Sequence, residues 1–364
     1  MDAMTEEKAG IDSAAESGPS TGASRRSATK KINLALQGGG AHGAFTWGVL
    51  DRLLEDERIV FEGISATSAG AMNATVTAYG MAEGGRQGAR QALANFWRRV
   101  SHVADFSALQ PSPFDRLTGN RHLENSPAFV LFDMMTRLLS PYQFNPVNYN
   151  PLRDVLTRVV DFDALRSATC PVKLFLSATN VRSGKVKVFG NDEITADAVL
   201  ASGCLPFLFQ AVEIDGESYW DGGYMGNPAI FPLIYHCESR DVAIVHINPL
   251  ERAEMPRSAT EILNRINEIS FNSSLMREMR AIYFVTGLID DGAVCENHLN
   301  KMLIHGISAE AEMSKLSVAS KLCADWGFLL DLKEIGRKTA ESWLGEHFED
   351  LGRRSTVDIQ VTYL

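Results

Sequence analysis

The feature that most limits the possible folds is a strand-to-helix pattern that occurs twice near the N-terminus. Residues 32–36 (INLAL) form a short apolar run that ends in a glycine-rich segment, as is typical of a buried strand. Residues 45–54 place apolar side chains on one helical stripe, residues 61–67 indicate a second strand, and residues 69–79 indicate a helix rich in small side chains. Strands that alternate with helices in this way predict a parallel sheet covered by helices.

Later segments extend this pattern. Apolar runs at residues 172–176 and 242–247 predict two more strands, and residues 185–188 are expected to pair with the first of them. Residues 212–223 indicate a hairpin, while residues 84–158 are predicted to be mainly helical. We therefore predict an α/β fold of three layers, in which a central, mostly parallel sheet is flanked by helices.

The composition divides the chain into three parts. Residues 1–30 are rich in Ala, Ser, Gly, Thr and charged residues, and they are predicted to be a disordered tail because they bury too little apolar surface. A tether to a membrane surface or to a partner is the alternative for this tail. Residues 31–236 form the predicted core, and residues 237–364 are expected to add a strand and helices packed on that core.

Four local segments give more specific expectations. A capping-box pattern that begins at Asp331 predicts the start of the last long helix, and Gly352 predicts its end. Residues 357–361 alternate in polarity and predict an edge strand. The apolar segments 127–139 and 205–209 are expected to be buried, with a lid and a wall of an acyl-chain channel as the respective alternatives.

The charge balance argues against one class of partner. The 364 residues contain 35 Lys and Arg against 45 Asp and Glu, a net charge of −10, so attraction to nucleic acid phosphates is not expected. Five scattered cysteines without a CxxC pair argue against a disulfide framework or a metal site.

Without an apolar leader or an apolar run of about 18 residues, the chain is predicted to be cytoplasmic, with peripheral membrane contact as a further option. The pattern leaves the oligomeric state open.

The glycine-rich segment is the first candidate for chemistry. Gly38, Gly39, Gly40, Ala41 and Gly43 follow a strand and precede a helix, so backbone N–H groups can converge there on a negatively charged oxygen. The spacing Gly38-x-Gly40-x-x-Gly43 also fits a dinucleotide-binding fingerprint. By itself, the segment indicates a site for either a cofactor pyrophosphate or a transition-state oxyanion.

The second candidate is Ser68, in the tight turn between the second strand and the second helix. Its neighbours Ala66, Ala69 and Gly70 are small, as a nucleophile elbow requires because its flanks meet the neighbouring backbone. Such a serine would expose its hydroxyl at the carboxyl end of the sheet. Taken alone, a helix N-cap is the commoner explanation of this residue.

The third candidate is Asp221, which is followed by Gly222 and Gly223 at the end of the predicted hairpin. Glycines beside an aspartate let its carboxylate approach another backbone segment closely, as an active-site base must. Taken alone, an ordinary Asp-Gly turn explains the pattern better.

In this order, the three segments resemble the patatin-like phospholipase family. The resemblance rests on Gly38–Gly43 as the glycine-rich oxyanion loop and on residues 66–70 as the G-x-S-x-G elbow, with alanine at its first position. Asp221–Gly223 matches the D-G-[GA] motif, and residues 202–206 (SGCLP) are similar to a fourth block of the family.

The resemblance covers roughly residues 32–232, with His42 where the family often has Lys or Arg. It implies a catalytic dyad in which Ser68 is the nucleophile and Asp221 accepts its proton. The implied activity is hydrolysis of lipid esters, of the phospholipase A or lysophospholipase type, without a cofactor. The residues implied to bind the oxyanion or the substrate are Gly38, Gly39, Gly40, Ala41, Gly43 and Ala69.

Four alternatives remain at this point. An acyltransferase would use the same dyad with an acceptor other than water. A nucleotide-binding oxidoreductase would bind a coenzyme at the glycine loop, whereas a non-catalytic scaffold would have lost the chemistry. A hydrolase triad would need a histidine as its third member, and the candidates are His236, His246, His298, His305 and His347.

Overall fold

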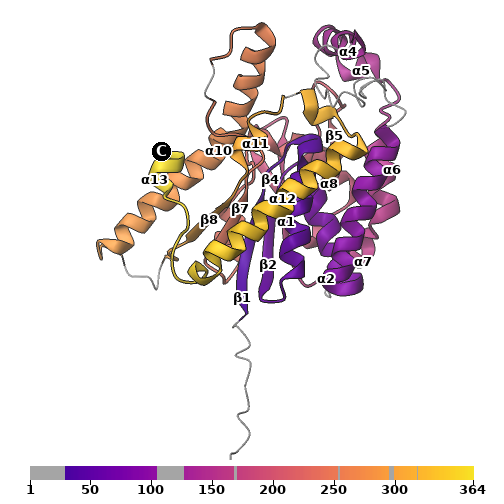
Figure 1. Ribbon diagram of the computed structural model, residues 1–364. Coiled ribbons are helices and arrows are strands. Elements are labelled where there is room, and N and C mark those ends of the chain that lie inside the picture. The colour runs from indigo at the N-terminus through magenta and orange to yellow at the C-terminus, as the bar shows by residue number, and fades with distance from the viewer. Residues whose placement is uncertain (1–28, 105–126, 168–169, 253–254, 295–298, 318) are drawn as a thin grey trace, which may run out of the picture.

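One mixed sheet of eight strands runs through the described part of the chain in the computed structural model (Figure 1). The structure describes residues 29–104, 127–167, 170–252, 255–294, 299–317 and 319–364. The strands are β1 (Lys30–Leu36), β2 (Ile59–Ala66), β3 (Lys173–Asn180), β4 (Val186–Phe189), β5 (Val212–Ile214), β6 (Glu217–Asp221), β7 (Asp241–Val245) and β8 (Leu303–Ile307). Their order in the sheet is β5-β6-β3-β2-β1-β7-β8, and β4 pairs with β3.

The centre of the sheet is parallel. Strand β1 pairs in parallel with β2 and β7, while β2 pairs in parallel with β3, and β7 with β8. The pairs β3–β4, β3–β6 and β5–β6 are antiparallel. The carboxyl ends of parallel strands meet at one edge of a sheet, so the loops after β1 and β2 become neighbours.

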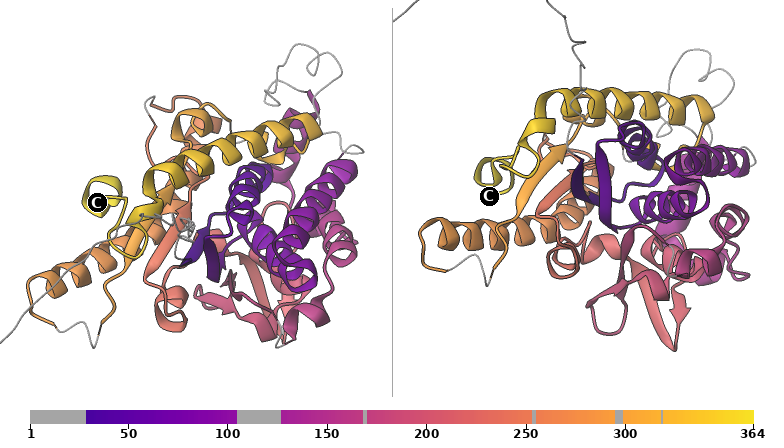
Figure 2. Two further views of the ribbon diagram at one scale, coloured as in Figure 1. Left: turned by 60° about the horizontal axis from the view of Figure 1, so that its bottom comes forward. Right: turned by 90° about the horizontal axis from the view of Figure 1, so that it is seen from below.

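Helices cover both faces of this sheet, and the predicted three-layer α/β fold is confirmed. Figure 2 shows α1 and α12 on one side of the strands and α10 on the other. The helices are α1 (Gly43–Glu55), α2 (Ala69–Ala104), α4 (Pro127–Leu138), α5 (Pro141–Phe144), α6 (Pro151–Val159), α7 (Phe162–Arg166), α8 (Ala196–Ser202), α9 (Phe231–His236), α10 (Ala259–Asp290), α11 (Glu310–Met313), α12 (Trp326–His347) and α13 (Ile359–Tyr363). Helix α2 is interrupted at Gly84 and Gly85, whose backbone angles are not helical.

The central strands are buried on both faces. In β1, the side chains of Ile32, Leu34 and Leu36 pack in the core formed with α1, α2 and α12. The intervening Ala35 packs in the second core, formed with α9, α10 and α13. Because successive side chains of a strand point to opposite faces, burial on both sides explains the nearly continuous apolar runs from which these strands were predicted.

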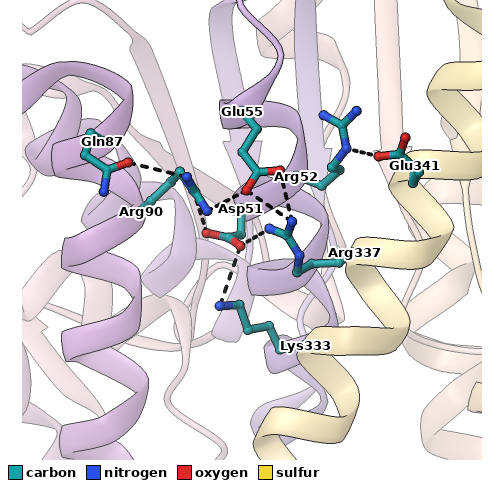
Figure 3. Close-up of polar contacts among 8 residues, drawn as sticks. All are labelled: Asp51, Arg52, Glu55, Gln87, Arg90, Lys333, Arg337 and Glu341. Carbon is teal, nitrogen blue, oxygen red and sulfur yellow. Dashed lines mark hydrogen bonds and ion pairs between the residues drawn. The ribbon is translucent and has the colours of Figure 1, made fainter.

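An ion-pair cluster joins α1, α2 and α12 at the edge of the first core (Figure 3). The buried Asp51 of α1 contacts Arg90 of α2 (2.9 Å, Oδ1 to Nε), together with Lys333 (3.5 Å, Oδ2 to Nζ) and Arg337 of α12. Glu55 contacts both arginines, at 2.6 and 2.9 Å. Burial alone would raise the pKa of Asp51, but the hydrogen bond from Arg90 and the surrounding positive charges lower it below its ordinary value.

Replacing Asp51 with asparagine is expected to lower the free energy of unfolding at neutral pH by about 2 kcal/mol. Removing one partner of a buried ion pair typically costs about 3–5 kcal/mol, and the effect is smaller here because the three cations keep 24–28% of their side-chain surface exposed. Since the pKa of Asp51 is lowered by folding, its contribution is present above the ordinary aspartate pKa and disappears as the pH falls through the lowered value.

Urea unfolding of both proteins at neutral and at acidic pH measures this difference. The control is Asp163→Asn, because Asp163 is 90% exposed in its contact with Arg166 and a surface pair contributes about 0–1 kcal/mol. Equal midpoints for Asp51→Asn and the unmodified chain at neutral pH would contradict a stabilising role of the cluster.

The C-terminal part contributes to the same sheet. Strands β7 and β8, which belong to the predicted C-terminal residues 237–364, extend the sheet beside β1, and α12 packs across α1. Strands from both sides of the predicted boundary at residue 236 therefore belong to one sheet. The division into residues 31–236 and 237–364 stays a prediction.

The predicted limits of the last long helix are wrong. Helix α12 begins at Trp326 rather than at Asp331, and it ends at His347, before Gly352. Its actual cap is Asp325, whose side chain accepts a backbone N–H of the first turn (3.1 Å). A side chain that accepts a hydrogen bond from an unpaired N–H group fixes the start of a helix. Asp325 and Asp331 can both act in this way, and the sequence prediction chose the second.

The predicted edge strand at residues 357–361 is also wrong. The side chain of Asp358 accepts hydrogen bonds from the N–H groups of Gln360 (2.9 Å) and Val361 (3.1 Å) and begins helix α13. Two satisfied N–H groups favour a helical turn over the extended conformation that the alternating pattern predicts.

Two apolar segments that were expected to be buried are partly exposed. Leu131 and Leu138, in the predicted segment 127–139, are 68% and 77% exposed, although the segment does form helix α4. In the segment 205–209, Phe207 is 69% exposed. The burial prediction is therefore wrong for these residues, because an apolar run does not by itself reveal whether a partner surface exists.

Some predictions lie outside the described residues. These are residues 1–28 of the predicted tail 1–30, whose last residue already belongs to β1, and residues 105–126 of the predicted helical region. Within the part of the chain that the structure describes, the helices lack the combination of length and apolar character that a membrane crossing requires.

Candidate active site

Ser68 lies in the turn between β2 and α2. Its φ angle is +56°, in the left-handed region that residues with a side chain rarely adopt. The N–H group of Ser68 donates to Ser202 Oγ (2.9 Å), and a side chain at Gly70 would overlap the carbonyl oxygen of Leu36. The turn therefore has the strained, closely packed geometry of a nucleophile elbow.

Asp221 is the last residue of β6, beside the end of β3. Its side chain is 2% exposed, and its Oδ1 accepts the N–H of Gly223 (2.7 Å). The hydroxyl of Thr179 donates to the Asp221 carbonyl oxygen (2.8 Å), while Gly222 lies directly against the carbonyl of Ser177, which leaves no space for a side chain. The Asp-Gly-Gly segment thus holds a buried carboxylate in place and is not a solvent-exposed turn.

The carboxyl group of Asp221 has a raised pKa. Burial raises this pKa to about 6, although hydrogen bonds from the Gly223 N–H and the Ser68 hydroxyl and the positive charge of Lys321 act in the opposite direction. At neutral pH the group is therefore mainly ionised and still able to take up a proton. A serine hydroxyl that interacts with such a carboxylate in one cavity is the arrangement that general-base activation of a nucleophile requires.

Ser68 and Asp221 line one small cavity of about 70 Å³. The glycine segment Gly38–Gly40 forms another part of its wall, so the three motifs of the sequence meet at one place. Phe271 and Lys321, from the C-terminal part of the chain, also line this cavity. No sequence motif singled out these two residues, because neither belongs to a local pattern.

The backbone amides of the glycine segment differ in whether they are already hydrogen-bonded. The N–H of Gly38 donates to Asn227 Oδ1 (2.7 Å), so this amide holds the loop in position. Gly39 and Gly40 follow it along the cavity wall, and Gly40 has a φ angle of +58°, which a residue without a side chain adopts at little cost. Of the predicted oxyanion donors in this segment, the amides of Gly39 and Gly40 are therefore the better candidates.

The other predicted motif residues lie behind the cavity wall. Ala41 belongs to the short helix η1 (Gly40–His42), and Gly43 begins α1, where a side-chain carbon would come within 2.8 Å of Ala69 Cβ. Ala66 is the fully buried last residue of β2. Ala69 begins α2, so its N–H belongs to the first helical turn, in which amides have no partner within the helix. None of these four residues is part of the cavity lining.

Polar side chains to which the sequence analysis assigned no role hold the loop in place. Gln37 Oε1 accepts the N–H groups of Ile247 (2.9 Å) and Asn248 (3.0 Å), and its Nε2 donates to the carbonyl oxygen of Asn227 (3.4 Å). Ser202, which accepts the Ser68 N–H, belongs to the SGCLP block and thus carried a signal. Asn227 and Asn248 carried none, because their partners are far away in the sequence.

The described histidines do not line the cavity that contains Ser68 and Asp221. They contact other groups: His246 contacts Tyr363, His305 contacts Asp241, His347 contacts Asp350, and His236 stacks on Phe175. The remaining candidate, His298, lies outside the described residues. Within the described residues, no group of three His, Cys, Asp or Glu side chains is arranged to hold a metal ion.

A second, larger cavity of about 600 Å³ lies beside the first. Leu138, Phe207, Trp220 and Tyr224 contribute to its wall. The ring of Tyr224 packs edge-on against Phe271 (5.1 Å between centroids), and Phe271 lines the small cavity. One aromatic pair therefore has a member in the wall of each cavity, and the exposed end of α4 borders the larger one.

Comparison with protein-family models identifies one family. Residues 34–234 match the family model described as patatin-like phospholipase. The chain is similar in structure to VipD from Legionella pneumophila, with 15% identity and a TM-score of 0.39, covering 88% of this chain and 68% of that one. It is also similar to the ExoU–SpcU complex of Pseudomonas aeruginosa, with 16% identity, a TM-score of 0.35 and coverage of 90% and 53%, so it spans about half of that chain. No curated protein matches the sequence.

Proposed function

The chain belongs to the patatin-like phospholipase family, and on this premise we propose that it is a serine acyl hydrolase that cleaves lipid esters through a Ser68–Asp221 dyad. One observation carries the proposal: a strained serine and a buried carboxylate, far apart in the sequence, line one cavity with the glycine segment. At about 70 Å³, this cavity is far smaller than the roughly 300–1,000 Å³ of typical cofactor sites. Its size favours an oxyanion over a dinucleotide pyrophosphate beside the glycines.

The proposed reaction has two halves. Ser68 Oγ attacks the ester carbonyl carbon while its proton passes to Asp221, and the amides of Gly39 and Gly40 stabilise the resulting oxyanion. The bond to the alcohol then breaks, and the alcohol leaves with the proton from Asp221. Water attacks the acyl-enzyme and gives a proton to Asp221, and the fatty acid is released when that proton returns to Ser68 Oγ.

The larger cavity supports a lipid as the substrate. Its wall includes the apolar side chains of Leu138, Phe207 and Trp220, which suit a fatty acyl chain better than a polar ligand. The exposed apolar residues of α4 at its border suit contact with a lipid surface. We therefore expect a phospholipase A or lysophospholipase activity, in the cytoplasm or peripherally on a membrane.

Labelling with a fluorophosphonate tests this proposal directly. The expected result is one covalent adduct on the peptide that contains Ser68, together with release of fatty acid from a panel of phospholipids and lysophospholipids. An adduct on a different serine, or no adduct and no hydrolysis, would overturn the proposal. Addition of an alcohol acceptor separates hydrolysis from acyl transfer, because a transferase would form a new ester in place of free fatty acid.

The pH dependence of hydrolysis is expected to report Asp221. Because this carboxyl group must be deprotonated to accept the serine proton, kcat/KM should rise with pH around the pKa of about 6 and fall about tenfold per pH unit below it. Initial rates on a neutral ester between about pH 4 and about pH 8 measure this profile, with activity retested at neutral pH to detect acid denaturation. A profile that is flat over this range would show that a group with this pKa does not act as the base.

A further inference from the structure

A short helix from the C-terminal part of the chain packs directly against the glycine segment. This helix is η5 (Ala319–Leu322). His42 Nε2 lies 2.7 Å from Ser320 Oγ, and the backbone carbonyl of Lys321 fills the position that a side chain on Gly40 would need. Lys321 and Leu322 also line the cavity that contains Ser68. The C-terminal part of the chain thus completes the wall of the candidate active site.

The ammonium group of Lys321 is linked to the glycine segment through one side chain. Its Nζ donates to Asn248 Oδ1 (2.7 Å), and Asn248 Nδ2 donates to the carbonyl oxygen of Gly38 (2.8 Å). One amide side chain therefore links the ammonium to the loop. An ammonium group has three donors, and among the described residues Asn248 takes up one of them, so the ammonium keeps further donor capacity.

The glycine segment carries no positive charge of its own. Its single basic side chain, His42, is buried, and burial together with the charges of Lys321 and Arg252 lowers its pKa well below the ordinary histidine value. The imidazole is therefore neutral near pH 7. Lys321 is the cation that lines this cavity in the described part of the chain.

We propose that Lys321 is a further catalytic residue, whose ammonium group stabilises the oxyanion that forms beside Gly39 and Gly40. This inference rests on the proposed acyl-hydrolase function. During attack by the serine, negative charge moves from Asp221 to the former carbonyl oxygen, next to the loop to which Lys321 is linked. A preorganised positive charge in a site that excludes water lowers the energy of such an oxyanion. Lys321 stays protonated throughout and transfers no proton.

The protonation of Lys321 is accessible to experiment. Burial lowers its pKa to about 8, with Arg252 acting in the same direction and the carboxylates of Glu268 and Asp221 opposing the shift. Since the proposed role needs the charged form, activity should decline as the pH rises through about 8. The Cys204 thiol and the Tyr224 phenol, which also interact with Asp221, have pKa values of about 12 and do not titrate in this range.

Two substitutions at one position test the proposal in the full-length chain. Lys321→Met should lower kcat by about 10²-fold, in the range for loss of one oxyanion donor, with a smaller change in KM. Lys321→Arg keeps the charge at all accessible pH values, so it should retain activity within about tenfold of the unmodified chain and lose the alkaline decline. The matched control is Lys315→Met, at an exposed lysine in the turn that precedes η5.

The measurements are kcat and KM on a neutral ester, the pH profile up to about pH 10, and thermal unfolding of each variant. A Lys321→Met variant with unchanged kcat, or a Lys321→Arg variant that keeps the alkaline decline near pH 8, would overturn the proposal. If Lys321→Met unfolds, the pH profiles of the arginine variant and the unmodified chain still decide. If the unmodified chain hydrolyses no ester and no fluorophosphonate adduct forms on Ser68, the proposed function fails, and this inference fails with it.

Discussion

Ser68→Ala is expected to lower the turnover of lipid esters by a factor on the order of 10⁶, as is typical for loss of a catalytic nucleophile. Without the hydroxyl, no acyl-enzyme forms, and only the glycine amides and substrate binding remain to promote attack by water. The substitution removes only the side-chain oxygen of residue 68. The turn is held by the hydrogen bond from the backbone N–H of this residue to Ser202 and by the close backbone packing at Gly70, so the fold should persist. Release of fatty acid and the thermal midpoint are the two measurements.

Asp221→Asn is expected to produce a loss of similar order, because the asparagine keeps the shape of the side chain but cannot accept the serine proton. The two residues act as a unit, so the double variant should be about as impaired as Ser68→Ala alone. Asp215→Asn is the matched control, since Asp215 lies exposed in the turn before β6 and should leave turnover unchanged. Activity in Asp221→Asn within tenfold of the unmodified chain would exclude the dyad.

Gly48→Ala is expected to cause a large loss of stability although it lies outside the site. Helices α1 and α12 pack with their backbones in contact: a side-chain carbon on Gly48 would overlap the carbonyl oxygen of Lys333, and one on Gly336 would overlap that of Phe45. Overpacking usually costs about 1–3 kcal/mol, and backbone atoms on both helices cannot turn away as a side chain can. We therefore expect the free energy of unfolding to fall by about 3 kcal/mol or more.

The same substitution at Gly345 is the control for this prediction. Gly345 lies on the exposed side of α12 with no atom near the position of a new side chain, so Gly345→Ala should stabilise the protein by about 0.5–1 kcal/mol through helix propensity alone. Urea unfolding of both variants measures the difference. If Gly48→Ala proved as stable as Gly345→Ala, the close packing of the two helices would be refuted.

Most strands were predictable because their signal is local. A strand buried on both faces must be apolar throughout, and β1 and β7 show this within a few residues of sequence. The motif that contains Ser68 was predictable for a similar reason, since a tight turn demands small neighbours wherever it occurs. The resemblance to the patatin-like phospholipase family is confirmed by the match over residues 34–234, whereas the roles assigned to Ser68 and Asp221 stay predictions.

The errors arose where two local signals compete or where a partner surface decides. Asp325 and Asp331 are both residues that can cap the start of a helix, and the local sequence does not show which of them does so. In the structure, Asp325 caps the helix. The apolar run of α4 looks the same whether a core or solvent faces it, and Leu138 proves to be exposed. Hydrophobic pattern reports what a segment can bury, not what is available to cover it.

The amino-acid sequence alone determined the alternation of strands and helices, the three short motifs and the order in which they occur, because each depends on residues that are neighbours along the chain. Only the tertiary structure decided which groups complete the site. Asn227 accepts a hydrogen bond from the Gly38 N–H, Phe271 lines the small cavity and packs against Tyr224, and Lys321 brings a positive charge to the glycine segment. These contacts join residues that are distant in sequence, and hydrogen bonds and charge interactions depend on distances in space, which exist only once the sheet and its two helical layers have packed together.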